Sequence, residues 1–161
     1  MDSYISTKVV FARPMTRECA EKYLGRAISF DRHIPDNEDD GYLVLYEDGY
    51  QSWCPLDAFE KASRKTDGMP YGLAVEAAKK GLKIARKGWN GKDMWVSVSP
   101  GCESLPASGF WNPAAASFAA SNGGFASVPP CFIMKTADGK IQMGWLASQA
   151  DMLTDDWCIV E

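Results

Sequence analysis

The alternation of hydrophobic and polar residues is clearest between residues 41 and 65. Two runs rich in aromatic and β-branched residues, YLVLYE and YQSW, flank Asp48-Gly49. This dipeptide favours a two-residue type I′ connection between antiparallel strands. Directly after the second run, Pro55 is well suited to begin a helix, and the apolar spacing in LDAFEKASRK continues it over residues 56–65. The pattern therefore predicts a β-hairpin followed by a helix.

A further helix is predicted upstream of the hairpin. Thr16 has the chemistry of an N-cap, apolar positions follow as far as Tyr23, and Gly25 is placed to end the helix. The next segment, residues 31–41 (DRHIPDNEDDG), is polar and rich in turn-forming residues, so we expect a loop.

The second part of the chain alternates short helices with strands. An alanine-rich helix is expected over residues 71–80, with Gly81 at its end, and strands are expected at residues 82–86 and 94–98. Further along, CFIMKT–ADG–KIQMGW reads as a second hairpin, SQADML as a short helical turn, and WCIV as a closing strand. Antiparallel strands joined by tight turns thus account for most of this region.

These elements predict an α+β protein that is dominated by antiparallel sheet, with short helices. Residues 66–68 (TDG) are a plausible boundary, which gives two small domains at residues 1–66 and 67–161. Domains of this size bury only a marginal core, and oligomerisation is one common remedy. Residues 99–130 differ from the rest because they are rich in Ala, Ser, Gly and Pro with scattered aromatics. Their composition predicts a long loop, and loops of that length are usually functional or interfacial.

Charge and cysteine content narrow the class of function. The net charge is −4 and no long block of like charges occurs, so the chain lacks the basic footprint expected for nucleic-acid binding. No apolar run is long enough to span a bilayer, and the first residues lack the pattern of a signal peptide. The five cysteines form no C-x-x-C pair, which argues against a disulfide framework or a zinc site and fits a reducing cytosol.

Residues for catalysis are scarce. The single histidine, His33, lies in the polar loop, and no second histidine exists for a metal cluster. The paired carboxylates Asp39-Asp40 and Asp155-Asp156 stand where acidic residues commonly mark turns or helix starts. We therefore expect no enzymatic activity, no cofactor and no metal, with a nucleotide-modifying enzyme that uses Asp151 or Asp155 as the least favoured reading.

Tryptophan is concentrated in the second part of the chain, where five of the six occur. Trp95 and Trp157 lie in strand-like runs and are expected in the core. Trp89, in the glycine-rich turn KGWNGK, and Trp145, after Gly144, stand at strand ends instead. Such rings either form a platform for a flat ligand ring or plug the end of a sheet, and the residues alone leave both readings open.

The neighbours of these two tryptophans suit a planar, anionic ligand. Arg86 and Lys92 supply positive charge on either side of Trp89, and Asn90 can both donate and accept hydrogen bonds. Ser148, Gln149 and Asp151 offer further polar contacts after Trp145. The motif is weak in isolation, because a charged hairpin turn has the same composition.

Two segments in combination resemble a known family of short phage proteins. GLAVEAAKKGLKIARKGWNGKDMWV and MKTADGKIQMGWLASQADMLTDDWCIVE, at about residues 69–98 and 132–161, are similar to the Thoeris anti-defence sponges of the second described type. The resemblance implies β-rich homo-oligomers, with a tetramer expected, that bind cyclic nucleotide immune signals between protomers. It implies sequestration without cleavage, in the host bacterial cytoplasm, of cyclic ADP-ribose isomers or of the cyclic dinucleotides of anti-phage cGAS-like systems.

The resemblance also implies residue roles. Trp89 and Trp145 would stack on the base, while Asn90, Ser148, Gln149 and Asp151 would bond the ribose or base. Arg86 and Lys92 would be phosphate partners. The alternative reading is a phage protein–protein interaction or virion accessory module in which the aromatics form a protein contact. The role of residues 1–66 stays open in both readings.

Overall fold

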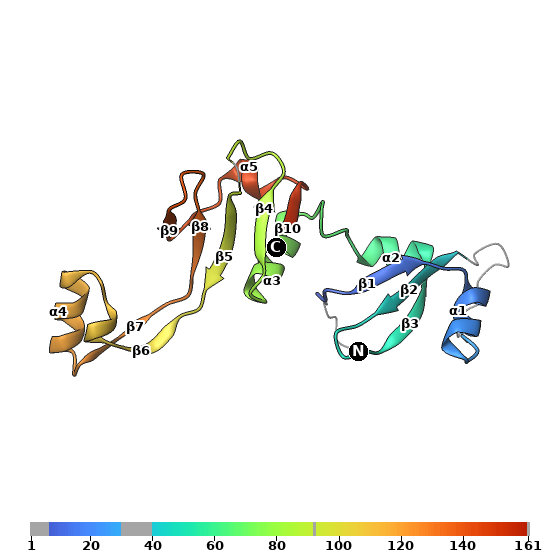
Figure 1. The fold of residues 1–161 in the computed structure, drawn as a ribbon, viewed down its shortest axis with the longest axis horizontal. Helices are drawn as coiled ribbons and strands as arrows, with labels where there is room; N and C mark the ends of the chain where they lie inside the picture. Colours follow the sequence, from blue (N-terminus) through green and yellow to red (C-terminus); the bar gives the residue numbers. More distant parts are fainter. Residues whose placement is uncertain (1–6, 30–39, 92, 161) are drawn as a thin grey trace. The chain divides into compact units, whose positions relative to one another are not determined.

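The computed structural model describes residues 7–29, 40–91 and 93–160. The chain divides into two compact units, Met1–Lys65 and Thr66–Glu161, and each is described by itself (Figure 1). All described strand pairs are antiparallel and the helices are short, so the predicted α+β class with antiparallel sheets is confirmed. The independent folding of the two regions as domains stays a prediction.

Unit 1 is a three-stranded sheet with two helices. Its elements are β1 (Phe11–Pro14), α1 (Arg17–Leu24), β2 (Gly41–Leu45), β3 (Gln51–Pro55) and α2 (Leu56–Ala62), and the strand order is β1-β2-β3. The predicted caps of α1 are confirmed, because the Thr16 hydroxyl accepts from the Cys19 N–H and Gly25 adopts a left-handed φ of 66°. Trp53 is buried, and its indole N–H donates to the Met15 carbonyl at 2.7 Å.

The hairpin of unit 1 has a different turn from the one that the sequence predicts. A two-residue type I′ turn needs positive φ at both central residues, but among the described non-glycine residues only Asp93 has positive φ. The Gly49 N–H instead donates to the Tyr46 carbonyl at 3.0 Å, and Gly49 has a φ of 83°. The type I′ prediction was therefore wrong: a four-residue turn closes the hairpin, and its last glycine restores the strand twist.

Gly41 is the position of unit 1 with the least room for a side chain. An added Cβ would lie 2.3 Å from the Cys54 carbonyl oxygen and 2.5 Å from the Trp53 ring. We expect Gly41→Ala to lower the free energy of unfolding by about 1–3 kcal/mol, because backbone and a buried indole must move. Urea denaturation of the full chain measures this effect. Gly72→Ala, where a Cβ meets open space in a helix, is the control and should not destabilise the protein. Equal stability of the two variants would contradict the close contact.

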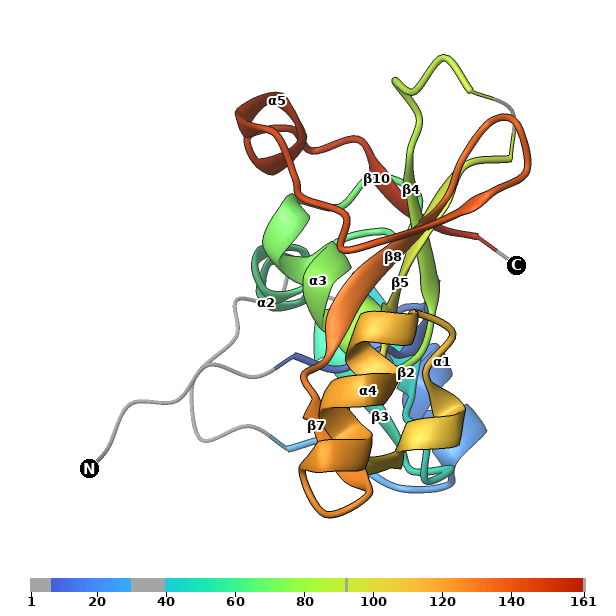
Figure 2. The same ribbon diagram turned by 90° about the vertical axis from the view of Figure 1, so that its left-hand side faces the viewer.

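Unit 2 is built on a five-stranded sheet with the order β10-β4-β5-β8-β9. Its elements are α3 (Tyr71–Lys79), β4 (Lys83–Arg86), β5 (Trp95–Ser99), β8 (Cys131–Lys135), β9 (Ile141–Met143), α5 (Gln149–Met152) and β10 (Trp157–Val160). Helices α3 and α5 lie on one side of this sheet (Figure 2). Three buried alanines of α3 pack with Ile84, Val96 and Trp157 to form the core of this unit.

Residues 99–130 are ordered rather than a loop. They form β6 (Cys102–Pro106), a short 3₁₀ helix (Ala107–Gly109), α4 (Pro113–Ser121) and β7 (Phe125–Val128). Strands β6 and β7 pair with each other and continue β5 and β8 away from the main sheet (Figure 1). The loop prediction was therefore wrong. Asn112 caps α4 by accepting from the N–H groups of Ala114 and Ala115, and Pro113 begins the helix. We call residues 102–128 the arm.

Candidate functional site

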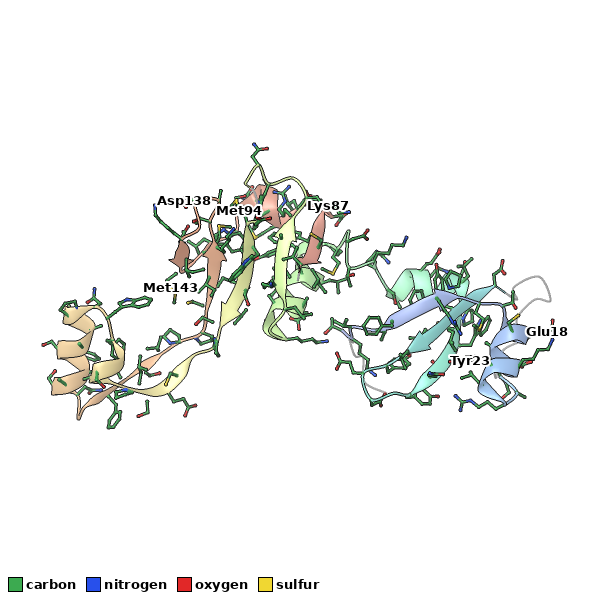
Figure 3. All side chains as sticks on the ribbon, viewed as in Figure 1. Glu18, Tyr23, Lys87, Met94, Asp138 and Met143 are labelled. Carbon is green, nitrogen blue, oxygen red and sulfur yellow. The ribbon has the colours of Figure 1, made fainter. Side chains whose placement is uncertain are left out.

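The predicted ligand residues that the structure describes lie in unit 2, at the end of the sheet where two turns meet. Lys87 and Met94 mark the β4–β5 turn and Asp138 marks the β8–β9 turn, and all three lie at this end (Figure 3). The two turns are packed closely, since a Cβ on Gly91 would approach the Ala137 Cβ to 2.9 Å. This end of unit 2 therefore brings together chain segments that are far apart in the sequence.

Three tryptophans form one cluster at the site. The ring centroid of Trp89 lies 6.1 Å from that of Trp145 and 5.4 Å from that of Trp157, and Trp145 and Trp157 are 6.2 Å apart. All three pairs meet edge to face, which is a favourable arrangement of aromatic rings. Trp157 is 0% exposed and Trp145 is 8% exposed, whereas Trp89 is only partly buried. Trp89 is thus the member of the cluster with the most surface left for a ligand.

Asp151 ties Trp89 to α5. One carboxylate oxygen accepts from the Trp89 indole N–H at 3.2 Å and from the Arg86 guanidinium at 2.8 Å. The other accepts from the Ser148 backbone N–H at 2.9 Å and from its hydroxyl at 2.7 Å, which completes a capping box on α5. The Asp151 carbonyl also accepts from the Trp157 indole at 2.8 Å. Asp151 therefore orients two of the three tryptophans.

Arg86 is held by two carboxylates. Besides its bond to Asp151, its Nε and Nη2 atoms donate to Asp156 at 2.9 and 3.3 Å. Asp156 also accepts from the Gly88 N–H at 3.0 Å and from the Thr154 hydroxyl at 2.9 Å. The guanidinium is mostly buried, and its single charge is outnumbered by the two aspartates. Arg86 thus joins β4, the β4–β5 turn and the segment before β10.

The network shifts the pKa values of its members. Burial alone would raise the pKa of Asp151, but hydrogen bonds from Ser148, Arg86 and Trp89 outweigh it and lower the pKa to about 2. The hydrogen bond from Arg86 is the main cause of a lowered pKa at Asp156, and the bond to Asp156 is the main cause of a raised pKa at Arg86. Asp151 is therefore ionised at neutral pH and a weak base, which disfavours it as a catalytic proton acceptor.

This pKa predicts a specific loss of stability in acid. A carboxylate whose pKa is lower in the folded state stabilises the fold above its unfolded-state value and loses that contribution as pH falls through the folded value. The contribution of Asp151 should therefore be constant from pH 7 to about 4 and disappear between about 4 and 2. Urea denaturation at a series of pH values measures it. Asp151→Asn should show a shallower acid slope, and an unchanged slope would contradict the network.

The structure places the predicted site residues in three groups. Five of them come together in the tryptophan cluster and its polar network, and these are Arg86, Trp89, Trp145, Ser148 and Asp151. Asn90 and Gln149 lie beside that network and are exposed, with no side-chain hydrogen bond to another described residue. Lys92 lies outside the described residues, as do His33 and Asp39. Ligand contact by each residue stays a prediction.

Two residues of the site, Trp157 and Asp156, are not among the ligand residues that the sequence predicts. Trp157 is expected only as core, yet it contacts both Trp89 and Trp145. Asp156 is considered only as half of a carboxylate pair, yet it holds Arg86 and the Gly88 N–H. The register of β4 and β10 places both Trp157 and Asp156 at the site, because Trp157 lies opposite Arg86. That register is a non-local property of the fold.

Other kinds of site receive no support from the described residues. Within residues 7–29, 40–91 and 93–160, no His, Cys, Asp and Glu side chains gather in a group of three that could hold a metal ion. Over the same ranges, no helix has the length and apolar character to cross a membrane.

Fold and site together define a small antiparallel α+β domain with an aromatic and acidic cluster at one end of its sheet. Residues 69–160 match the model of the Thoeris anti-defense 2-like domain. Thoeris anti-defense 2 of Bacillus phage SP01 is 34% identical to the chain over 95 residues, covering 57% of this chain and 94% of that relative. The chain therefore belongs to the Thoeris anti-defense 2-like family, as the sequence resemblance indicates.

Membership supports a phage anti-defence role acting in the host. The matched range includes the two tryptophan turns and the whole arm. Residues 1–68 lie outside the family match.

Proposed function

We propose that unit 2 binds a cyclic nucleotide immune signal, a cyclic ADP-ribose isomer or a cyclic dinucleotide, and holds it uncleaved in the host bacterial cytoplasm. The observation that carries this proposal is the partly buried Trp89 ring, whose indole N–H is bound by Asp151. The exposed Asn90 follows Trp89 in the chain, and the exposed Gln149 follows Ser148 of the same network. An indole that is already oriented loses little freedom when a base stacks on it. Family membership supports a phage anti-defence role, which capture of an immune signal would serve.

The ligand contacts divide by chemistry. Stacking on an aromatic ring is worth about 1–3 kcal/mol per base, whereas nanomolar capture requires about 12 kcal/mol. Most of the affinity must therefore come from hydrogen bonds and phosphate contacts. Asn90 and Gln149 are the free amides for base or ribose edges, while Ser148 and Asp151 are already engaged with each other.

Phosphate recognition needs a donor other than Arg86. Two aspartates already hold its guanidinium, and Asp156 also occupies the Gly88 N–H. We infer that Arg86 positions the site and that phosphate is bound by other cations, with Lys92 and a second copy of the chain as the candidates. A homo-oligomer with pockets between protomers, as the family resemblance implies, would supply such groups.

The same chemistry supports capture without cleavage. A carboxylate with a pKa of about 2 is a poor proton acceptor at neutral pH, and all four hydrogen bonds to Asp151 occupy its oxygens. Asp155 is exposed and lies outside the network. We therefore propose sequestration rather than turnover.

Calorimetric titration of the full-length protein with a cyclic ADP-ribose isomer and with a cyclic dinucleotide tests this proposal. We expect saturable binding of at least one of them. Trp89→Ala should weaken it by about 10- to 100-fold, because one stacking contact is lost. Gln149→Ala should weaken it by about 10-fold, since one hydrogen bond to the ligand is lost and such a bond is worth about 1 kcal/mol or slightly more.

Gln51→Ala is the matched control, because the same residue type is removed from unit 1, outside the family match. It should leave the affinity unchanged. Heat of binding from neither nucleotide, or equal affinities for Trp89→Ala and the wild type, would contradict the proposed site.

A further inference from the structure

Two tyrosines and two cations form a continuous row at the turn end of the β2–β3 hairpin in unit 1. The Lys8 Nζ atom lies 5.1 Å from the centre of the Tyr46 ring, and the ring centres of Tyr46 and Tyr50 are 5.7 Å apart. At the other end, the Arg26 Cζ atom lies 5.7 Å from the centre of the Tyr50 ring. Each cation therefore stacks on a tyrosine, and the two tyrosines contact each other. We call Lys8, Tyr46, Tyr50 and Arg26 the tyrosine row.

The backbone of the hairpin holds the tyrosine row in place. The Tyr46 N–H donates to the Tyr50 carbonyl at 2.9 Å, and the Tyr50 N–H donates to the Asp48 carboxylate at 2.9 Å. The Arg26 Nη2 atom donates to the Gln51 carbonyl at 2.9 Å, which orients the guanidinium beside the Tyr50 ring. Side chains that are oriented in advance lose little freedom when a partner binds.

The two cations of the row have no acidic partner among the described residues. The described ion pairs of unit 1 each join residues one helical turn apart, in α1 and in α2, and they involve neither Lys8 nor Arg26. Both cations are exposed, and Tyr50 is 53% exposed. Tyrosine and arginine are the residue types that most often dominate binding at protein interfaces. The row therefore suits a partner that brings carboxylates of its own.

We propose that the tyrosine row binds an acidic segment of a second protein. One carboxylate of that segment pairs with Lys8 and another with Arg26, while an apolar or aromatic side chain between them covers the two tyrosines. Because neighbouring members of the row are 5.1 to 5.7 Å apart, the two cations are separated by at most about five residues of extended peptide. The negative charge of Glu47 and Asp48 disfavours a carboxylate over the turn itself, which restricts the partner's acidic groups to the two ends of the row.

Charge favours a protein over a nucleic acid as the partner. A nucleic acid carries a phosphate at every nucleotide, and its affinity depends on the number of phosphates that cations neutralise. Two cations neutralise few phosphates, and Glu47 and Asp48 repel a continuous phosphate backbone. A peptide can instead carry its carboxylates at the two ends of the row alone. The row lies outside residues 69–160, so the proposal goes beyond nucleotide capture and does not rest on it.

Fluorescence anisotropy with the full chain at low ionic strength tests the proposal. The probes, each labelled with fluorescein, are a copolymer of glutamate and tyrosine, polyglutamate, and single-stranded oligothymidylate. We expect saturable binding of the copolymer and weaker binding of polyglutamate, which has no apolar side chain to cover the tyrosines. Oligothymidylate should bind more weakly than the copolymer. Added salt should weaken binding of the copolymer, because the ion pairs are exposed.

Variants of the full chain locate the binding surface. Lys8→Gln/Arg26→Gln should weaken binding of the copolymer by about tenfold, since two ion pairs are lost. Arg13→Gln/Arg64→Gln is the matched control, because it removes two exposed positive charges from unit 1 outside the row, and it should leave the affinity unchanged. Arg13 also stacks on a tyrosine, but the register of β1 and β2 places it on the opposite face of the sheet from Tyr46.

Lys8→Glu tests the row without touching the hydrogen bonds of Arg26, and it should also weaken binding of the copolymer by about tenfold. Circular dichroism of each variant checks that the fold is retained. Copolymer that does not bind, equal losses in the row variant and its control, or tighter binding of oligothymidylate than of the copolymer would overturn the proposal. Trp89→Ala should bind the copolymer as the wild type does, and Lys8→Gln/Arg26→Gln should bind cyclic nucleotides as the wild type does. Failure of this inference is therefore distinct from failure of the proposed function.

Discussion

Replacement of Trp145 by alanine is expected to lower the free energy of unfolding of unit 2 by about 3–5 kcal/mol. Trp145 is almost fully buried and contacts Trp89, Trp157 and Phe132 edge to face. Its removal leaves a large cavity in a small core and breaks three aromatic pairs at once. Urea denaturation of the full chain, followed by circular dichroism, measures the loss.

The neighbouring Leu146 provides the control. It lies one residue further along the same segment and is almost fully exposed, so Leu146→Ala should change stability by less than about 0.5 kcal/mol. A Trp145→Ala protein as stable as Leu146→Ala would show that the ring is not part of the core. Because Trp145 supports the fold, Trp145→Phe is the better variant for ligand binding, and Trp89→Ala is the more direct test of stacking.

Arg86→Met is expected to destabilise unit 2 by about 3–5 kcal/mol at neutral pH. The substitution removes the cation that both Asp151 and Asp156 share, and it leaves two largely buried carboxylates without it. Their pKa values, which the arginine keeps low, should rise. The loss of stability should therefore shrink as pH falls below about 4, where the carboxylates of the variant take up protons.

Two further variants separate this effect from a general loss of packing. Lys87→Met removes the adjacent cation, which is exposed and 3.9 Å from Asp67, and should cost less than about 0.5 kcal/mol. Adding Asp156→Asn to Arg86→Met should recover part of the lost stability, because one uncompensated charge is removed. If the double variant were less stable than Arg86→Met alone, charge would not be the reason for the loss.

The elements that the sequence predicts well are those specified by neighbouring residues. The hairpins at residues 48–49 and 138–139, though not the turn type of the first, the cap at Thr16 and the glycine end of α1 all depend on residues close together in the chain. The sequence does not predict the strands and helix of the arm, because its composition resembles that of a linker and the pairing of β6 with β7 spans the whole segment. A local signal was nevertheless present, since Asn112-Pro113 is a good helix start.

Only part of the site could be predicted from the sequence, for the same reason. Proximity of Trp89 to Arg86 follows from their spacing, but the contact of both with Asp151 requires the packing of α5 on the end of the sheet. The sequence also predicts a free positive charge at Arg86. Its neutralisation by Asp156 could not be predicted, because the two residues lie 70 positions apart in the chain. A glycine next to a tryptophan also does not predict that the ring is exposed, because Trp145 follows Gly144 and is buried.

Recovery of the captured nucleotide tests the central claim most directly. Full-length protein is mixed with a cyclic ADP-ribose isomer or a cyclic dinucleotide below the concentration of binding sites. Free nucleotide is removed by filtration, and the retained protein is heated and its supernatant separated by chromatography. The account predicts that one of these nucleotides stays with the protein and returns chemically unchanged on heating. Passage of every such nucleotide through the filter, or release of an altered product, would contradict it.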